Sequence, residues 1–297
     1  MSTKITYIDY EKSQGLEKEI ESIQQFFSPS DFSENEQISK YPTPESYIRD
    51  YMLSLDGMEF KKQIDQLDGS CRVLDVGVGR GNTSIYLASR GHSVSVVEPS
   101  PEFCRLLGLA TNLYSLSLKI YNCNAESIQK INGLFDVIIF NSSLHHCDDP
   151  IKALKSCYSC LSERGKLLLI NEPILQFYRS EKWFYTRLET HPHEMGHYGG
   201  NEHNYRYHEY LEMLKKAGFL KVTSEPHISL TDYQGRVKQA EVIMCKERPL
   251  YDPRDIQIKK IYYYVVYKLI TLDLLDKIFP KLLTYLSLVP STFIATK

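Results

Sequence analysis

The sequence lacks a large net charge of either sign, since it has 35 Lys and Arg residues and 37 Asp and Glu residues, and the formal net charge is −2. A chain with no excess of positive charge has no global field that would draw it to nucleic acid. We therefore expect no nucleic acid among its partners. The apolar content of 42% and the charged content of 24% are those of a soluble globular protein.

Long uninterrupted apolar runs are also missing. The first residues, MSTKITYIDYEK, lack the apolar core of a signal peptide, so a cytoplasmic protein is expected. The most apolar stretch, 257–291, contains Lys268, Asp273, Asp276 and Pro280 and is not a clean membrane span. Three interpretations of it stay open: helices packed on the core, a homodimer interface, or an amphipathic surface that contacts a membrane or a lipid-linked acceptor.

Cysteines are few and do not form a pattern of pairs. Their number, seven, is odd, and they are scattered through apolar segments, which indicates free thiols in a reducing compartment. Cys157 and Cys160 form a CxxC, but they lie in a predicted helix and no second pair accompanies them. We interpret the two residues as helix packing.

One stretch, VLDVGVGRGN at 73–82, organises the chain. An apolar run ends at Asp75, glycines follow at positions 77, 79 and 81, and a helical pattern begins behind them. This pattern predicts a buried strand, a tight turn and a helix whose free N–H groups face a ligand. The dinucleotide fingerprint GxGxxG is not complete, because its third glycine would fall at Asn82.

The next predicted strand ends on an acid. Glu98 follows the run HSVSVV and precedes Pro99, about 20 residues after the first glycine. A carboxylate at the tip of this strand can accept hydrogen bonds from both hydroxyls of a ribose. The two motifs together predict a nucleoside cofactor.

With these motifs the sequence resembles the class I S-adenosylmethionine-dependent methyltransferases, in particular the small-molecule group. The matching positions are Asp75, Gly77, Gly79, Gly81, Glu98, NAES at 124–127 and FDVIIFNSSLHHCDDP at 135–150. The resemblance covers roughly residues 70–246. It implies an α/β fold with a doubly wound, Rossmann-like sheet of seven strands, the last one antiparallel, and S-adenosyl-L-methionine as cofactor.

Alternating strand and helix patterns agree with such a parallel sheet. Strands are predicted near 72–77, 93–98, 117–121, 134–140, 165–171, 219–225 and 238–245, and helices near 82–90, 101–113, 126–130 and 150–162. We expect an N-terminal helical cap over the active site at 1–69, with a helix start at Thr43. The cofactor-binding domain is expected at 70–248, with an acceptor lid at 174–205, and an apolar helical extension at 249–297.

The resemblance also assigns cofactor contacts. It implies that the glycines let the cofactor approach, that Asp75 organises its methionine amino end and that Glu98 holds the ribose. Asn124 and Ala125 would read the adenine. Pro99 and Asn141, at the ends of two predicted strands, complete the expected cofactor set.

Histidines supply the candidate bases. His145 and His146 follow the fourth core strand, and an imidazole there can take a proton from an acceptor hydroxyl. We expect one of the two, and not both, to reach the pocket. His197, Glu202 and His203, in the lid, are further candidate bases.

The lid contains the letters of a zinc-peptidase motif. His193, Glu194 and His197 spell HExxH, which needs a helix so that both histidines share a face. Pro192 precedes the motif and glycines interrupt it, so a peptidase is not expected. A different metal site, built from the lid histidines with Glu194 or Glu202, stays an alternative to the expectation of no metal.

The function expected from these motifs is methyl transfer to a small-molecule or glycan acceptor, at a hydroxyl oxygen, with a His or Glu general base. Three alternatives stay open: an N-methyltransferase for a small amine, a nicotinamide-dependent oxidoreductase and a non-catalytic cofactor-binding protein. The (D/N)PPY-type motif of many amino-methylating nucleic-acid enzymes is absent after the fourth strand, where NSSL stands instead.

Overall fold

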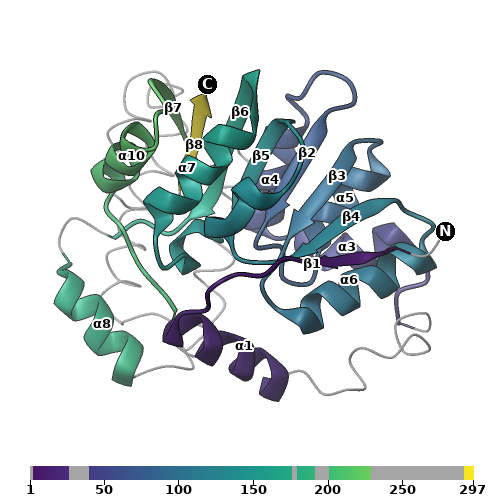
Figure 1. Ribbon diagram of the computed structural model, residues 1–297, viewed down its shortest axis with the longest axis horizontal. Helices are drawn as coiled ribbons and strands as arrows, with labels where there is room; N and C mark the ends of the chain where they lie inside the picture. Colours follow the sequence, from purple (N-terminus) through teal and green to yellow (C-terminus); the bar gives the residue numbers. More distant parts are fainter. Residues whose placement is uncertain (1–2, 27–39, 176–178, 191–200, 229–290) are drawn as a thin grey trace, which may run out of the picture.

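The computed structural model describes residues 3–26, 40–175, 179–190, 201–228 and 291–297 (Figure 1). Its centre is a sheet of eight strands in the order β1-β4-β3-β2-β5-β6-β8-β7. The strands are β1 (Ile5–Tyr7), β2 (Arg72–Val76), β3 (Ser93–Val97), β4 (Leu118–Asn122), β5 (Phe135–Asn141), β6 (Leu161–Glu172), β7 (Lys221–Pro226) and β8 (Ser291–Thr296). The predicted α/β class and the doubly wound sheet are confirmed.

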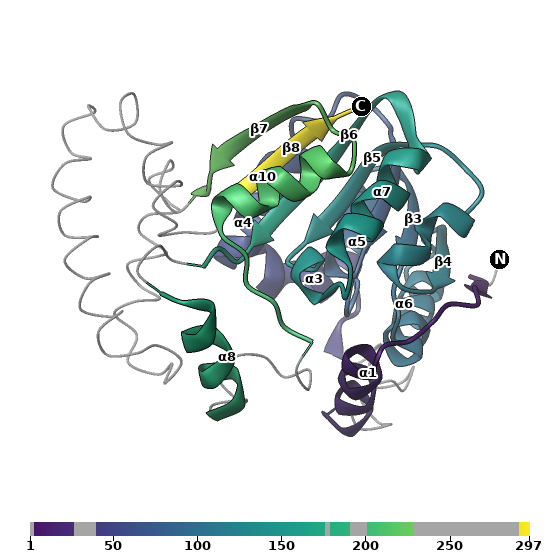
Figure 2. The same cartoon turned by 60° about the vertical axis from the view of Figure 1, so that its left-hand side comes forward.

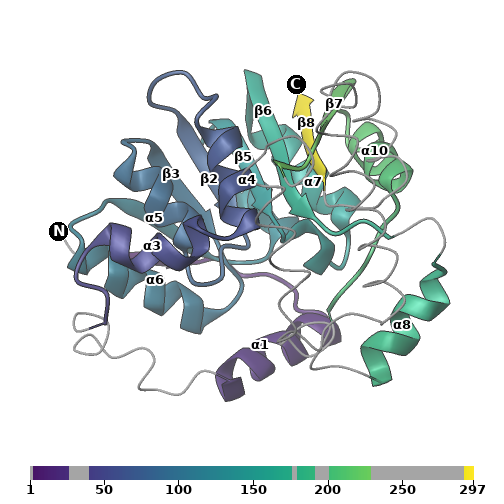
Figure 3. The ribbon, with the colours of Figure 1, turned by 180° about the vertical axis from the view of Figure 1, so that it is seen from behind.

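Helices cover both faces of the sheet. They are α1 (Gln14–Phe26), α3 (Pro44–Met52), α4 (Leu55–Ile64), α5 (Asn82–Ser89), α6 (Pro101–Leu113), α7 (Pro150–Cys160), α8 (Glu181–Thr190), α10 (Tyr207–Lys216) and the short 3-10 helices η2 (Ala125–Lys130) and η3 (Leu144–His146). Figure 1 shows α7 and α10 in front of the sheet, and Figure 3 shows α3, α4 and α5 on the opposite face.

Two apolar layers follow from the alternation of side chains along buried strands. On one face Val73, Val94 and Val137 pack with helices α3 to α6, and Phe60 is fully buried there. On the other face Leu74 packs with its neighbours against η2, α7 and α10. Cys157 and Cys160 lie in this second layer as free, buried thiols, as the packing interpretation predicted.

The start of α3 agrees with the sequence. The Thr43 hydroxyl accepts from the backbone N–H of Ser46, the Ser46 side chain closes the capping box, and Pro44 begins the helix. The apolar pattern behind it divides into two helices, because Ser54 caps a second one, α4, through the N–H of Gly57.

The sheet differs from the prediction at both ends of the chain. Among the residues that the structure describes it has eight strands and not seven, because Ile5–Tyr7 adds a parallel edge strand beside β4. The antiparallel strand was expected at 238–245, which lies outside the described residues. The strand that runs antiparallel between β6 and β7 is instead β8, in the C-terminal segment expected to be helical (Figure 2). The expected partner contacts through 257–291 fall on residues outside the described ranges, apart from Ser291.

Among the described helices, none is long and apolar enough to cross a membrane.

Because β8 joins two strands that are distant in sequence, its central aromatic residue should matter for stability. Phe293 is fully buried, and its ring centroid lies 5.2 Å from that of Tyr210 and 5.4 Å from that of Tyr207. We expect Phe293→Ala to lower the free energy of unfolding by about 3–5 kcal/mol in a urea titration. The control, Leu220→Ala, removes a side chain that is 92% exposed and should change it by less than about 0.5 kcal/mol.

Candidate active site

A cavity of about 330 Å³ opens at the carboxyl ends of the central parallel strands. The chain continues from β2 toward β3 and β4 on one side and returns to β5 and β6 on the other, so the sheet reverses between β2 and β5. Such a reversal leaves a crevice outside the strand ends. The residues that line the cavity are Leu16, Glu19, Ile23, Val76, Gly77, Val78, Gly79, Arg80, Asn82, Val97, Glu98, Pro99, Phe103, Asn124, Ala125, Glu126, Phe140, Ser142, Ser143, His146, Cys147 and Asp148.

The glycine turn forms one wall of the cavity. All three glycines have positive φ angles, at 69°, 52° and 81° for Gly77, Gly79 and Gly81. A Cβ on Gly77 would lie 2.6 Å from Cβ of Ser143, and one on Gly81 would lie 2.5 Å from Leu107. Packing therefore requires glycine at position 77, whereas at position 81 the flexible Leu107 side chain could shift and the positive φ angle is what favours glycine. Gly79 faces the open cavity.

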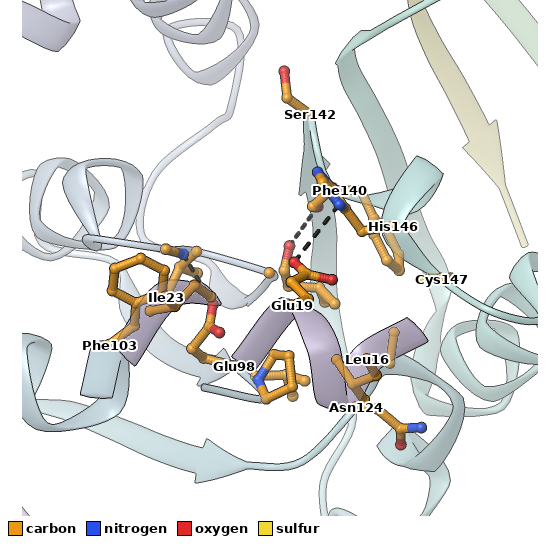
Figure 4. A pocket seen from close by; sticks show the side chains of 18 of the residues that line it. Leu16, Glu19, Ile23, Glu98, Phe103, Asn124, Phe140, Ser142, His146 and Cys147 are labelled. Atoms are coloured by element: carbon orange, nitrogen blue, oxygen red, sulfur yellow. Dashed lines mark hydrogen bonds and ion pairs between the residues drawn. The ribbon is translucent and has the colours of Figure 1, made fainter. Parts of the chain in front are cut away.

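Glu98 is held at the tip of β3. Its Oε2 accepts from the backbone N–H of Gly79 at 2.9 Å, and its Oε1 accepts from that of Ser100 at 2.8 Å. Burial raises the pKa of Glu98 to about 7, and these N–H groups oppose part of that rise. The carboxylate lies in the cavity wall, next to the glycine turn, as Figure 4 shows.

Asp75 and Asn141 lie behind the wall and do not line the cavity. The Asp75 carboxylate accepts from the hydroxyls of Thr83 and Ser84, both at 2.6 Å, and thereby joins β2 to the start of α5. Burial raises its pKa to about 6. Asn141 donates to the Tyr51 hydroxyl at 2.7 Å and accepts from Asn171 at 2.8 Å.

Asn124 and Ala125 line the far end of the cavity, after β4. The Oδ1 atom of Asn124 is buried, and it has no hydrogen-bond partner within the described part of the chain. A buried acceptor without a donor costs free energy, which a ligand N–H group in the cavity would recover. The adenine amino group is such a donor.

Helix α1 closes the cavity from outside the sheet. Leu16, Glu19 and Ile23 share one face of this helix and all three line the cavity. The sequence predicted a helical cap at 1–69 but did not single out these residues. Their spacing, three and then four residues apart, places them on one face of a helix and was the pattern that could have identified them.

Residues 201–203 are bound to the corner that follows β5. Asn201 donates through Nδ2 to the carbonyl of His146 at 2.6 Å, and its own carbonyl lies 3.1 Å from Nδ1 of His146. The backbone N–H of His203 donates to the carbonyl of His145 at 3.0 Å. These bonds place the Glu202 carboxylate between the two histidine rings, 3.5 Å from Nε2 of each.

Of the two adjacent histidines, only His146 lines the cavity, as the sequence predicted for one of the pair. His145 is buried behind it, with Nδ1 at 2.8 Å from Oε2 of Glu172. Burial alone would lower the pKa of His145, but the Glu172 carboxylate outweighs it and the pKa lies above its usual value. Burial lowers the pKa of His146, and the adjacent His145 lowers it further.

Two further carboxyl groups lie at this end of the cavity. Burial raises the pKa of Glu19 to about 9, with added repulsion from Glu98 and Glu202. Burial likewise raises the pKa of Glu202 to about 7. Figure 4 shows the Glu19 carboxyl group pointing at the ring of His146, from which its Oε1 is 3.6 Å away.

The remaining candidate bases lie elsewhere. His203 does not line the cavity, and its Nδ1 lies 3.2 Å from the Tyr185 hydroxyl. His197 and the HExxH letters fall in 191–200, outside the described residues.

Residues 74–169, which contain the glycine turn, Glu98, Asn124 and both histidines, match the family model of a methyltransferase domain. This part of the chain is a methyltransferase domain of the class I, S-adenosylmethionine-dependent type. The cofactor of this family is S-adenosylmethionine, and the unpartnered Oδ1 of Asn124 and the carboxylate of Glu98 fit its adenosine.

Relatives that are named for their activities match this chain over part of their length. A ubiquinone biosynthesis O-methyltransferase of Xanthomonas euvesicatoria pv. vesicatoria (strain 85-10) is 31% identical over 103 residues, which are 33% of this chain and 41% of that protein. A tRNA 5-carboxymethoxyuridine methyltransferase of Escherichia coli K12 is 30% identical over 102 residues, 33% of this chain and 39% of that one. The chain thus spans about two fifths of these relatives.

A solved structure resembles this chain over more of the chain's length. It is phosphoethanolamine N-methyltransferase 2 of Haemonchus contortus, in complex with phosphomonomethylethanolamine and S-adenosylhomocysteine. The TM-score is 0.55 and the identity 16%, over 94% of this chain and 60% of that chain. At this identity the likeness concerns the fold alone.

The position of Glu98 predicts a pH dependence of cofactor binding. Only the ionised carboxylate accepts from both ribose hydroxyls, so protonation below a pKa of about 7 should weaken binding. We expect the affinity for S-adenosylhomocysteine, measured by calorimetry, to be about tenfold lower at pH 6 than at pH 8. The neighbouring titratable groups are Asp75, Glu19, Tyr10 and Cys104.

These neighbours remain in Glu98→Gln, so this variant is the control. It should bind more weakly at pH 8 and lose most of the pH dependence. An unchanged pH dependence in Glu98→Gln would assign the titration to another group.

Asn124 gives a second prediction. If its Oδ1 accepts from the adenine amino group, wild-type protein should bind S-adenosylhomocysteine more tightly than the inosine analogue, in which an oxygen replaces that amino group. We expect a difference of about 1–3 kcal/mol, which calorimetry resolves, and its loss in Asn124→Ala. Equal discrimination by both proteins would contradict this contact.

Proposed function

We propose that the protein transfers the methyl group of S-adenosylmethionine to a hydroxyl oxygen of a small-molecule or glycan acceptor. The observation that carries this proposal is that His146 lines the same cavity as the glycine turn and Glu98, with Glu202 directly behind it. A proton acceptor therefore lies beside the space for the cofactor. A hydroxyl is a poor nucleophile until it loses its proton, so such a group favours oxygen as the acceptor atom.

The proposed division of roles follows the two ends of the cavity. Glu98 and Asn124 hold the adenosine, and the cluster of His145, His146 and Glu202 receives the acceptor hydroxyl. S-adenosylmethionine supplies an electrophilic methyl group on its sulfonium. The acceptor oxygen forms the new bond to this carbon, the carbon–sulfur bond breaks with its electron pair on sulfur, and the hydroxyl proton passes to the cluster.

Alignment should provide much of the rate enhancement. In-line displacement needs the nucleophile, the methyl carbon and the sulfur in a row, and such positioning is worth roughly 7–11 kcal/mol in favourable cases. Glu172 contributes by holding His145 and the backbone of this corner in place. Leu16 and Ile23 on α1 cover the cavity and keep water from it.

A small amine is the second candidate acceptor, and the acidic groups favour it. Glu19, Glu202 and Asp148 lie at one end of the site, where a protonated amine would favour the ionised forms of Glu19 and Glu202, whose pKa burial has raised. Such an amine would still have to lose its proton before it attacks the methyl group. The atom that carries the new methyl group distinguishes the two acceptors.

The test is transfer of isotopically labelled methyl groups from S-adenosylmethionine to a panel of hydroxylated sugars, phenols and small amines, followed by mass spectrometry and NMR of the product. We expect O-methyl products, and Glu202→Gln should lower kcat by about 10²–10⁴-fold. The affinity for S-adenosylhomocysteine should stay unchanged, which shows that the variant is folded.

Three results would contradict the proposal. The first is methyl transfer only to nitrogen. The second is full activity of Glu202→Gln. The third is that no acceptor is methylated although the protein binds S-adenosylhomocysteine. As a matched control, Glu212→Gln removes an exposed acid of α10 that pairs with Lys216 and should keep its full activity.

A further inference from the structure

Three side-chain atoms that carry lone pairs converge beside the cavity. They belong to His145, His146 and Glu202, each of which offers one ligand atom, and these three atoms lie within 4.8 Å of one another. Nε2 of each histidine lies 3.5 Å from a different oxygen of the Glu202 carboxylate.

Hydrogen bonds on the far side of each ring decide where the ring protons lie. Nδ1 of His145 faces Oε2 of Glu172 at 2.8 Å, and this carboxylate also accepts backbone N–H groups from Ser143, Leu144 and His145. Nδ1 of His146 faces the carbonyl of Asn201 at 3.1 Å. Both partners are acceptors, so each neutral ring carries its proton on Nδ1 and turns the lone pair of Nε2 toward Glu202.

Three lone pairs that face one another repel unless a proton or a metal cation lies between them. The separation of 3.5 Å exceeds the length of a good hydrogen bond between nitrogen and oxygen. It is close to the distance of about 3.3 Å that separates two ligand atoms of a tetrahedral zinc ion with bonds of about 2.0–2.1 Å. These two nitrogen–oxygen distances therefore suit a shared metal ion better than direct hydrogen bonds.

We propose that His145, His146 and Glu202 bind one divalent transition-metal ion, for which zinc is the best match. Two imidazoles and one carboxylate are a known ligand set of catalytic zinc, with a further position left open. The bonds from the Nδ1 atoms to Glu172 and to the carbonyl of Asn201 are those that orient metal-binding histidines.

The open position gives the metal a role in the proposed methyl transfer. Because His146 lines the cavity, an acceptor hydroxyl there could become the remaining ligand. Zinc lowers the pKa of a bound oxygen, so a metal-bound hydroxyl would release its proton to solvent more readily. With the metal bound, solvent would take this proton in place of the cluster, whose lone pairs the metal occupies. This role rests on the proposed function, whereas binding of the metal does not.

Metal binding is tested on the full-length chain after treatment with a chelator and dialysis. Titration with zinc should show one ion bound per chain, and X-ray absorption at the zinc edge should show two imidazole ligands and oxygen. Titration with cobalt should give the visible absorption of a four-coordinate ion. These measurements on wild-type protein need no variant, and failure to bind one equivalent would overturn the inference.

Two variants locate the ion. Glu202→Gln and His146→Gln should each weaken zinc binding by more than about a hundredfold, since even loss of a residue behind a ligand costs 10–100-fold. Titration with S-adenosylhomocysteine checks that each variant is folded. The control, His92→Gln, removes an imidazole that accepts from the N–H of Cys71, and should leave zinc binding unchanged. If the zinc affinity is unchanged in both variants, the ion binds elsewhere. Protons shared between the two histidine rings and the Glu202 carboxylate would then form the hydrogen bonds of this cluster.

The two proposals fail differently. Methyl transfer that persists at full rate in metal-free protein, with no zinc bound, would overturn the metal site and leave the proposed function standing. Zinc binding that depends on Glu202, in a protein that methylates no acceptor, would support the site and contradict the function.

Discussion

The active-site corner depends on one buried carboxylate. Glu172, at the end of β6, accepts hydrogen bonds from three consecutive backbone N–H groups and from the ring of His145. Removal of this acceptor would leave four donors without a partner in a region closed to water, each at a cost of about 1–3 kcal/mol. The same bonds fix the His145 ring and turn the next residue, His146, toward the cavity. A contact between neighbouring strands thus sets the chemistry of the site.

Close packing at the reversal of the sheet makes the cavity. The Ser143 hydroxyl donates to the carbonyl of Val76 at 2.7 Å, and the space beside Gly77 is filled by the Ser143 side chain. Strands β2 and β5 therefore meet at their carboxyl ends without room for a side chain at position 77. Three segments distant in sequence supply the rest: α1 brings Glu19, the corner after β5 brings His146, and residues 201–203 bring Glu202.

Much of the core could be predicted, because its signals are local. The strand before Asp75, the glycine turn and Glu98 lie within about 25 residues, and strand and helix periodicity identified their elements. A helical cap was expected at 1–69, but the residues of α1 that line the cavity were not identified, because an amphipathic helix indicates that it buries a face without indicating what that face covers. The three-residue strand β1 and the place of β8 were missed because both depend on pairing with strands more than 100 residues away.

By itself the sequence determined the class of fold, the glycine turn and the acid that suits a ribose, since each follows from residues close together in the chain. Tertiary structure decided which residues meet. It placed Asp75 beneath the turn, left Asn124 with an unpaired acceptor and brought Glu202 between two histidines that lie more than 50 residues earlier. The physical reason is that burial and hydrogen-bond partners depend on the packing of distant segments, which local periodicity does not encode.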